Sequence, residues 1–430
     1  MQAPTSFARS LLISAAVVLS GTTSQADSQR PAATPNAVLQ WNSTALDVLP
    51  VDPGLLLDSR AFAIMHAAIH DAVNGIERRY QPYTADLSSP GASVDAAVAA
   101  AARDSLVALS PTQQGRVDLA YAVTLATIPD GPAKSAGIAL GQACAQANLA
   151  RRASDGLDTV TEPVYVPNGQ PGDYAFTPPF DVPPLGPAAL FPGWGRLTPF
   201  GIELGEHRVS GPDALQSRRY ADDFNLVKRI GRLDSSSRSA EQTDIALFWF
   251  EFSPIGWNRI ANAAIRDEHL DVWRSARILA LVNFALADGY IAGFEAKYHF
   301  RFWRPYTAIR QGNQDGNPFT SADATWRPLL STPPLFIPPV PDYPSTHSVL
   351  GAAAAEVLRQ NLGDNFHFTA TSDTLPGATR RFKSFGDAAH ENGLSRVYGG
   401  IHFLHAVMDG LEQGKGIGRS VSRLLPRVEH

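Results

Sequence analysis

Hydrophobic residues recur at helical spacing along most of the 430-residue chain. The apolar side chains of residues 59–80 form one stripe, and the segments 93–109, 115–128 and 133–154 are Ala-rich with the same spacing. Helical patterns return at about residue 217 and continue through the last third of the chain. No strong strand alternation and no fixed repeat is present. The pattern therefore predicts an all-α protein built from helical bundles.

Two stretches, 155–213 and 311–344, contain too many Pro and Gly residues for regular structure. A loop of this length in a compact protein tends to be functional, and we expect 155–213 to form a wall over a site. On this pattern we divide the chain after residue 26 into an N-terminal helical half, 27–235, and a C-terminal helical bundle, 236–430.

The first residues have the features of a secretory signal peptide. Arg9 is followed by an apolar run at 11–21, and Ser24 and Ala26 suit the small-residue requirement of a cleavage site. The run is about half as long as a membrane span. We predict a signal peptide at 1–26 and export to the periplasm or secretion. No later apolar stretch is long and unbroken enough to predict a membrane span.

Composition narrows the classes of protein. The hydrophobic content of 44% and charged content of 18% are typical of globular chains. A net charge of -5 without a basic tail gives no indication of a nucleic-acid partner. Cys144 is the only cysteine, so the chain has no internal disulfide.

Residues 297–305, KYHFRFWRP, place three cations among four aromatic rings. If the segment is helical, Lys297, Arg301 and Arg304 lie on one face. We expect Lys297 and Arg304, two helical turns apart, to offer fixed positive charge and several hydrogen-bond donors.

Two further stretches add groups of matching chemistry. Ser345 directly precedes an Ala-rich helical run, and the first N–H groups of a helix together with a serine hydroxyl bind oxyanions. Arg396 supplies more donors, and His347 and His402 can move protons or form a bond near neutral pH. Each stretch alone is most simply a solvated face or a capped helix. Together they predict a pocket for a tetrahedral anion such as phosphate or vanadate.

The three stretches read Lys-x6-Arg-Pro, Pro-Ser-x-His and Ser-Arg-x5-His. This pattern resembles the superfamily that joins vanadium-dependent haloperoxidases with phosphatidic acid phosphatase type 2 and bacterial acid phosphatases. It covers residues 297 to 402, about a quarter of the chain. The helical half before it is more similar to the bacterial haloperoxidase branch than to the shorter phosphatases.

The resemblance implies a role for each matching residue. His402 would bond vanadium axially, or attack phosphorus in a phosphatase. His347 would be the acid and base, and Lys297 would also polarise bound peroxide. The oxygens of vanadate, or of phosphate in the same site, would be held by Lys297, Arg304, the Ser345 hydroxyl, the Thr346 backbone N–H and Arg396.

The implied activity is oxidation of halide by hydrogen peroxide, with halogenation of small organic substrates. The alternative is a soluble acid phosphatase with a phosphohistidine intermediate. The family pattern has Gly where this chain has Thr346, and an aromatic residue or His where it has Val340; Phe294 keeps the aromatic character of chloride-oxidising relatives. Phosphatases commonly have an acid where this chain has Ala406, which favours the haloperoxidase. Whether the chain forms a homo-oligomer stays open.

Other residues carry weaker signals. His66 and His70 are spaced i, i+4, as in some metal sites, although a buried helix explains them better. For Glu251, in an aromatic run, we weigh an ion pair with Arg396 or Arg304 against a partly exposed position. Arg301 is expected to be a salt-bridge partner or a second-layer cation.

Overall fold

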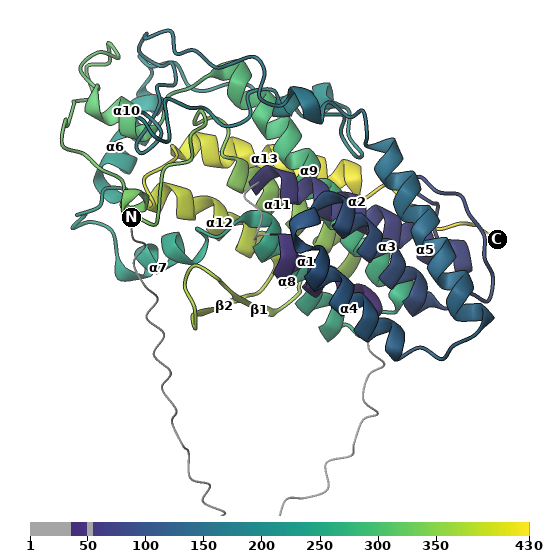
Figure 1. Ribbon diagram of the computed structural model, residues 1–430. Helices are drawn as coiled ribbons and strands as arrows, with labels where there is room; N and C mark the ends of the chain where they lie inside the picture. The colour runs from purple at the N-terminus through teal and green to yellow at the C-terminus, as the bar shows by residue number, and fades with distance from the viewer. Residues whose placement is uncertain (1–35, 50–54, 430) are drawn as a thin grey trace, which may run out of the picture. The chain divides into compact units, whose positions relative to one another are not determined.

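This computed structural model describes residues 36–49 and 55–429, and the predicted signal peptide lies outside them. The described chain is mostly helical, which confirms the predicted all-α class (Figure 1). The first helices are α1 (Ala37–Val48), α2 (Leu55–Ile76), α3 (Val94–Leu109), α4 (Gln114–Ala126) and α5 (Pro132–Arg151). The others are α6 (Arg218–Ile230), α7 (Ala240–Phe248), α8 (Ser253–Asp267), α9 (Val272–Phe300), α10 (Pro305–Arg310), α11 (Thr346–Leu362), α12 (Phe385–Tyr398) and α13 (Leu404–Val421).

Small residues let α2, α3 and α5 pack closely, at the right in Figure 1. A Cβ at Gly141 of α5 would lie 2.3 Å from the carbonyl oxygen of Ala97 in α3. Such a distance excludes any side chain larger than hydrogen. The Ala-rich pattern of the sequence therefore serves close helix packing here.

The helix α9 is the centre of the core. Among the described helices it alone is long and apolar enough to cross a membrane, but 94% of its most apolar window is buried inside the protein. It packs against α2 on one side and α11 on the other, and α11 packs against α12 and α13. One core therefore spans both predicted halves, and the division at residue 235 stays a prediction.

The Pro- and Gly-rich stretch 155–213 is irregular, as predicted. It contains only short 3-10 turns, η3 (Leu157–Thr159), η4 (Trp194–Arg196) and η5 (Leu204–His207). Asp288 of α9 accepts hydrogen bonds from the backbone N–H groups of Phe200 and Gly201, at 2.6 and 2.8 Å. Asp288 therefore anchors this loop to the core helix.

One feature differs from the sequence prediction. The strands β1 (Phe368–Thr371) and β2 (Thr379–Phe382) form a small antiparallel hairpin between α11 and α12. Four-residue strands are too short to give a clear alternation in the sequence.

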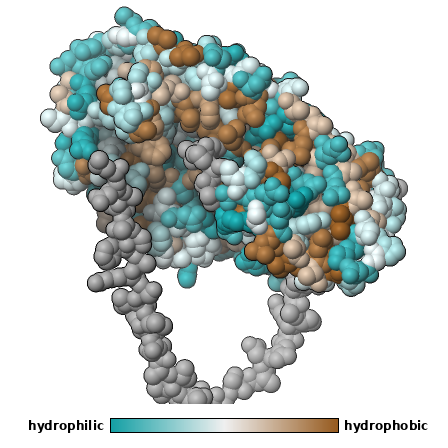
Figure 2. Space-filling view, in the orientation of Figure 1, coloured by the Kyte–Doolittle hydropathy of each residue, from teal (hydrophilic) through white to brown (hydrophobic). Residues whose placement is uncertain are grey.

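On the surface in Figure 2, hydrophobic areas are broken up by hydrophilic ones.

Candidate active site

The cations of residues 297–305 do not share a helix face, so that prediction is wrong. The helix α9 ends at Phe300, and Arg301 has the left-handed backbone conformation, with φ 53°. Arg304 then caps the N-terminus of the separate helix α10. Lys297 and Arg304 are brought together by this turn of the chain. Both side chains are buried, with 0% and 1% of their surfaces exposed.

Both cations bind the loop that leads into α11. Lys297 Nζ donates to the carbonyl oxygens of Pro341 at 2.7 Å and Asp342 at 3.0 Å. Arg304 Nε donates to the Val340 oxygen at 2.7 Å, and its Nη2 donates to the Pro338 oxygen at 3.3 Å. These contacts fix the loop next to the two charges.

The loop delivers Ser345 to the N-terminus of α11, as predicted. Ser345 is fully buried and caps the helix, and its hydroxyl accepts a long hydrogen bond from Ser348 N at 3.5 Å. Its own backbone N–H donates to the oxygen of Ala406 in α13 at 2.9 Å. Thr346 is the first helical residue, where a backbone N–H has no partner within the helix.

The Thr346 side chain is accommodated by a glycine on α9. A Cβ at Gly293 would lie 2.7 Å from Thr346 Cγ2. The methyl group of Thr346 thus occupies the space that a side chain at Gly293 would need. The methyl group of Thr346 therefore packs against α9 at this position.

His402 lies against Arg304. Arg304 Nη1 donates to the Ile401 oxygen at 2.7 Å and lies 3.0 Å from His402 Nε2. A guanidinium group can only donate, so Nε2 carries a lone pair and Nδ1 carries the hydrogen. That Nδ1 is 2.9 Å from Asp342 Oδ1, although the two atoms are not aligned for a hydrogen bond.

His347 and Arg396 meet at one backbone oxygen. His347 Nε2 lies 3.0 Å from the carbonyl oxygens of both Trp249 and Glu251. Carbonyl oxygens only accept, so Nε2 carries the hydrogen and Nδ1 keeps a lone pair. Arg396 Nη1 donates to the same Trp249 oxygen at 3.2 Å, while its buried Nε has no hydrogen-bond partner among the described residues.

The electrostatics of these groups follow from burial and from each other. Burial and the Arg304 charge hold the pKa of Lys297 well below its usual range. Burial lowers the pKa of Arg396 to about 9, with a further contribution from Arg304. The pKa of His402 is also lowered well below its usual range by burial, and then by Arg304, Lys297 and Arg396. The structure therefore places three buried basic side chains close enough to affect the pKa of His402 together.

His347 is also a neutral base near pH 7. Burial, and then Arg396, lower its pKa well below the usual range, while the two carbonyl acceptors oppose that shift. A neutral ring with a free lone pair can take up a proton from a ligand.

Asp342 and Trp249 belong to this site, and the sequence analysis did not single them out. Asp342 is fully buried, and burial raises its pKa to about 6 against the effects of Arg304 and Lys297. A carboxylate three residues before Ser345 was a visible signal for it. Trp249 contributes a backbone oxygen, for which no sequence signal exists.

Glu251 does not pair with Arg396 or Arg304. It pairs instead with Arg259 of α8, with 2.5 Å between Oε2 and Nη2. Because Arg259 is eight residues later on the adjoining helix, it is the nearer partner in the chain. Only the backbone oxygen of Glu251 contacts the site, through His347.

The remaining candidates are structural. Arg301 forms a bidentate ion pair with Asp173, at 2.8 and 3.0 Å, which confirms the salt-bridge prediction. His66 bonds the side chain of Asn42 at 2.9 Å, and His70 bonds a backbone oxygen. Among the described residues no group of three or more His, Cys, Asp or Glu side chains could hold a metal ion.

The loop 155–213 borders the site. Its Leu190 N–H donates to the Pro339 oxygen at 2.8 Å, and its Gly172 oxygen accepts from Trp303 N at 2.9 Å. Pro339 and Trp303 adjoin Val340 and Arg304, which bind each other. The loop therefore supports the segments that carry the cations, consistent with a wall over the site.

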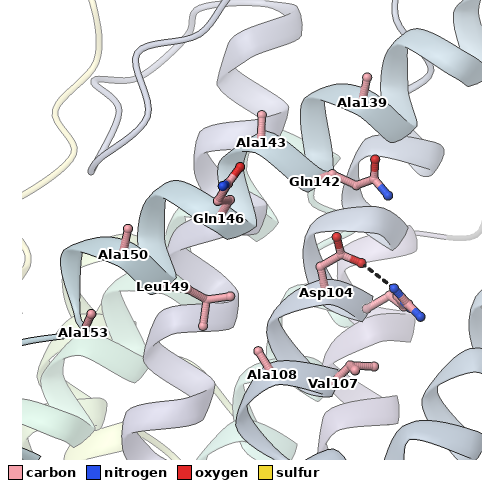
Figure 3. A pocket seen from close by; sticks show the side chains of 11 residues that line it. Asp104, Val107, Ala108, Ala139, Gln142, Ala143, Gln146, Leu149, Ala150 and Ala153 are labelled. Atoms are coloured by element: carbon pink, nitrogen blue, oxygen red, sulfur yellow. Dashed lines mark hydrogen bonds and ion pairs between the residues drawn. The ribbon is translucent and has the colours of Figure 1, made fainter.

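A surface pocket of about 840 Å³ lies elsewhere, on α3 and α5. Figure 3 shows alanine side chains on both helices together with the amides of Gln142 and Gln146, and the two charged lining residues, Arg103 and Asp104, pair with each other at 2.9 Å. None of the predicted site residues lines it. Its composition offers little for recognising a charged ligand, so the buried cations define the candidate active site.

Comparison with known proteins points to the same region of the chain as the candidate active site. Residues 277–428, which include all three motifs, match the family model for the VCPO second helical-bundle domain. The chain is 26% identical over 486 aligned positions to the vanadium chloroperoxidase of Curvularia inaequalis, covering 86% of this chain and 78% of that protein. A bacterial vanadium-dependent iodoperoxidase structure superposes with a TM-score of 0.79 at 25% identity, covering 94% and 100% of the two chains.

These matches support the vanadium haloperoxidase family for this chain. Its helical fold is shared with a bacterial vanadium-dependent chloroperoxidase in the holo form, with a TM-score of 0.68 at 16% identity over 88% of this chain and 92% of that one. Similarity to these proteins supports a haloperoxidase-like enzyme.

Proposed function

We propose that this protein is a vanadium-dependent haloperoxidase that uses hydrogen peroxide to oxidise halide and so halogenates small organic substrates. The observation that carries the proposal is the contact between Arg304 Nη1 and the lone pair of His402 Nε2, inside a site with two more buried cations. A neutral histidine facing a cationic site suits an anion that also accepts a bond from nitrogen.

The residues present fit vanadate. Lys297, Arg304 and Arg396 are buried cations, and Arg396 Nε has no partner among the described residues. We propose that these three, with the Ser345 hydroxyl and the Thr346 N–H, hold the vanadate oxygens. His402 Nε2 would bind the vanadium. When bound, vanadate would supply Lewis-acid activation of peroxide without a change of valence.

The chain's own groups have distinct tasks in this proposal. The three cations stabilise negative charge in a place from which water is largely excluded, where such stabilisation is strongest. His347 takes up a proton at Nδ1 when peroxide binds and returns it later, and its lowered pKa keeps the ring neutral beforehand so that Nδ1 has a free lone pair. Two of the three donors of the Lys297 ammonium group bind carbonyl oxygens, so one would remain for a vanadate oxygen.

The phosphatase alternative uses the same residues, because a phosphoryl group needs the same charge stabilisation. The position four residues after His402 is Ala406, whose backbone oxygen accepts from Ser345 N. This residue brings no carboxylate to the site, which favours the haloperoxidase.

A parallel assay on vanadate-loaded and phosphate-loaded protein tests the proposal. We expect peroxide-dependent halogenation of a phenolic dye only after vanadate loading, with iodide, bromide and chloride compared in separate reactions. The His402→Ala variant should lose this activity. Hydrolysis of p-nitrophenyl phosphate without any halogenation would contradict the proposal and support the phosphatase.

We also propose that the protein is exported, because residues 1–26 have the features of a signal peptide. N-terminal sequencing of protein recovered outside the cytoplasm should begin at Asp27. Recovery of only the uncleaved chain from the cytoplasm would contradict export.

A further inference from the structure

Asp342 is a buried carboxylate that lies beside two residues of the proposed site, His402 and Arg304. Its Oδ1 lies 2.9 Å from His402 Nδ1 and 4.0 Å from Arg304 Nη1. Its backbone oxygen accepts from Lys297 Nζ at 3.0 Å. The side chain is 0% exposed, and neither carboxylate oxygen has an aligned hydrogen bond in the described part of the chain. A buried carboxylate is costly unless neighbouring charges compensate it.

The hydrogen of His402 connects Asp342 to the ligand position. Arg304 requires a lone pair on Nε2, so the neutral ring carries its hydrogen on Nδ1, next to Asp342. Coordination through Nε2 withdraws electrons from the ring and makes the Nδ1–H group more acidic. A carboxylate at that group stabilises the polarised ring and increases the basicity of the coordinating nitrogen. The field of the carboxylate acts at 2.9 Å even before the two groups align.

We propose that Asp342 is a positioning residue for His402. Its carboxylate holds the ring with Nδ1–H towards itself and so strengthens Nε2 as a ligand for vanadium. This inference rests on the proposed vanadate site. Asp342 acts only through His402, and it needs no contact with peroxide, halide or the organic substrate.

A second explanation predicts the opposite sign for anion binding. If Asp342 only compensated the cations, its removal would make the site more positive and would tighten binding of every oxyanion. Phosphate would bind this site through charge and hydrogen bonds alone, because the phosphorus of free phosphate does not accept a bond from His402 at equilibrium. Vanadate and phosphate affinities should therefore separate when Asp342 is replaced.

Equilibrium binding of orthovanadate and of inorganic phosphate, without peroxide or halide, tests the inference. For Asp342→Ala we expect vanadate affinity to fall by about 10-fold to 100-fold, the usual effect of losing such a partner. Phosphate affinity should stay the same or rise. Asp342→Asn keeps an acceptor of the same shape without the charge, so its loss should be smaller. This variant decides the question if Asp342→Ala does not fold.

Asp223 provides a matched control. Its Oδ2 lies 2.8 Å from Nδ1 of His405, three residues after His402, so Asp223→Ala removes a comparable pair outside the cation site. We expect this variant to bind vanadate as the wild type does.

Two results would overturn the inference. One is a vanadate affinity equal to or higher than that of the wild type in the folded Asp342 variants. The other is an equal loss of vanadate and phosphate affinity, which indicates general damage. A wild-type protein that binds neither anion would refute the proposed function itself, and that outcome is distinct from both.

Discussion

Arg304 Nη1 lies 3.0 Å from His402 Nε2, and the same nitrogen donates to the backbone oxygen of Ile401. One guanidinium group therefore sets both the position of the His402 backbone and the side of the ring that carries a lone pair. Through Nε and Nη2 it also holds the loop that leads to Ser345. Arg304 belongs to the first sequence motif and contacts the loop before the second motif and His402 of the third. It forms no hydrogen bond with Arg396, the other site residue of the third motif.

Arg304→Lys should fail to replace this link. A lysine ammonium is one point of charge and cannot reach the oxygens of both Val340 and Ile401. Hydrogen bonds to charged groups are worth about 1.5–3 kcal/mol each. We therefore expect a loss of vanadate affinity of about 10-fold or more, measured by equilibrium binding. Arg301→Lys is the control, since its ion pair with Asp173 lies outside the site, and an equal loss there would contradict the prediction.

Gly293 and Thr346 should be energetically coupled. A Cβ at Gly293 would lie 2.7 Å from Thr346 Cγ2, so Gly293→Ala should destabilise the protein by about 1–3 kcal/mol through overpacking. In the Thr346→Gly background the clash disappears, and alanine is the better helix former by about 1 kcal/mol. A double-mutant cycle in urea should therefore give Gly293→Ala opposite signs in the two backgrounds. Additive free energies would show that the two residues do not compete for space.

The residues that could be predicted from sequence are those whose role depends on local chain geometry. Ser345 precedes an Ala-rich helical run, so its position at a helix start follows from neighbouring residues alone. The periodic apolar pattern likewise predicted the helices, while the four-residue strands were too short to detect. The segment 297–305 was misread because Arg301 adopts a left-handed conformation that ends α9. Non-glycine residues seldom do this, and their sequence gives little warning.

Long-range contacts set the rest of the site. Trp249 reaches His347 and Arg396 across about a hundred residues or more of chain, through a backbone oxygen that every residue type possesses. Neither interpretation weighed for Glu251, an ion pair with Arg396 or Arg304 or a partly exposed position, is correct, because α8 brings Arg259 to the buried carboxylate and the path of that helix cannot be read from spacing. Asp342 lies outside the Pro-Ser-x-His motif at 344–347, and nothing in the spacing indicates that its side chain lies beside His402.

Lys297→Met should separate stability from ligand binding. Burial and Arg304 hold the pKa of Lys297 well below its usual range, so its charge opposes folding of the ligand-free protein. Methionine has a similar length and no charge, so it removes the cost of burying that charge beside Arg304 and gives up two hydrogen bonds to the loop. We expect the ligand-free variant to melt at the same temperature as the wild type or higher, in a thermal shift assay.

In the presence of phosphate, the wild type should gain more thermal stability than the Lys297→Met variant. A ligand at about 100 times its Kd stabilises the folded state by about 2.7 kcal/mol, so phosphate should raise the melting temperature of the wild type. The Lys297→Met variant should show a smaller rise, while Lys383→Met, which replaces an exposed lysine, should behave as the wild type. An equal rise in all three proteins would place the phosphate elsewhere.

His66 should contribute to loss of stability in acid. It is fully buried, and burial lowers its pKa to about 3 from an unfolded value of 6.5. Between pH 6.5 and about pH 3, His66 is therefore protonated in the unfolded chain and neutral in the folded chain. The contribution of His66 is complete above pH 6.5 and is lost as the pH falls towards 3, by up to about 1.4 kcal/mol per pH unit.

His66→Gln should reduce this dependence on pH. Glutamine keeps a donor for the Asn42 oxygen, which lies 2.9 Å from His66 Nε2, but it does not titrate. The free energy of unfolding in urea should fall less steeply between about pH 6 and about pH 4 than in the wild type. Some slope should remain, because burial also lowers the pKa values of His70, His347 and His402. His390→Gln, at an exposed position on α12, should keep the wild-type slope, and an unchanged slope in His66→Gln would contradict the prediction.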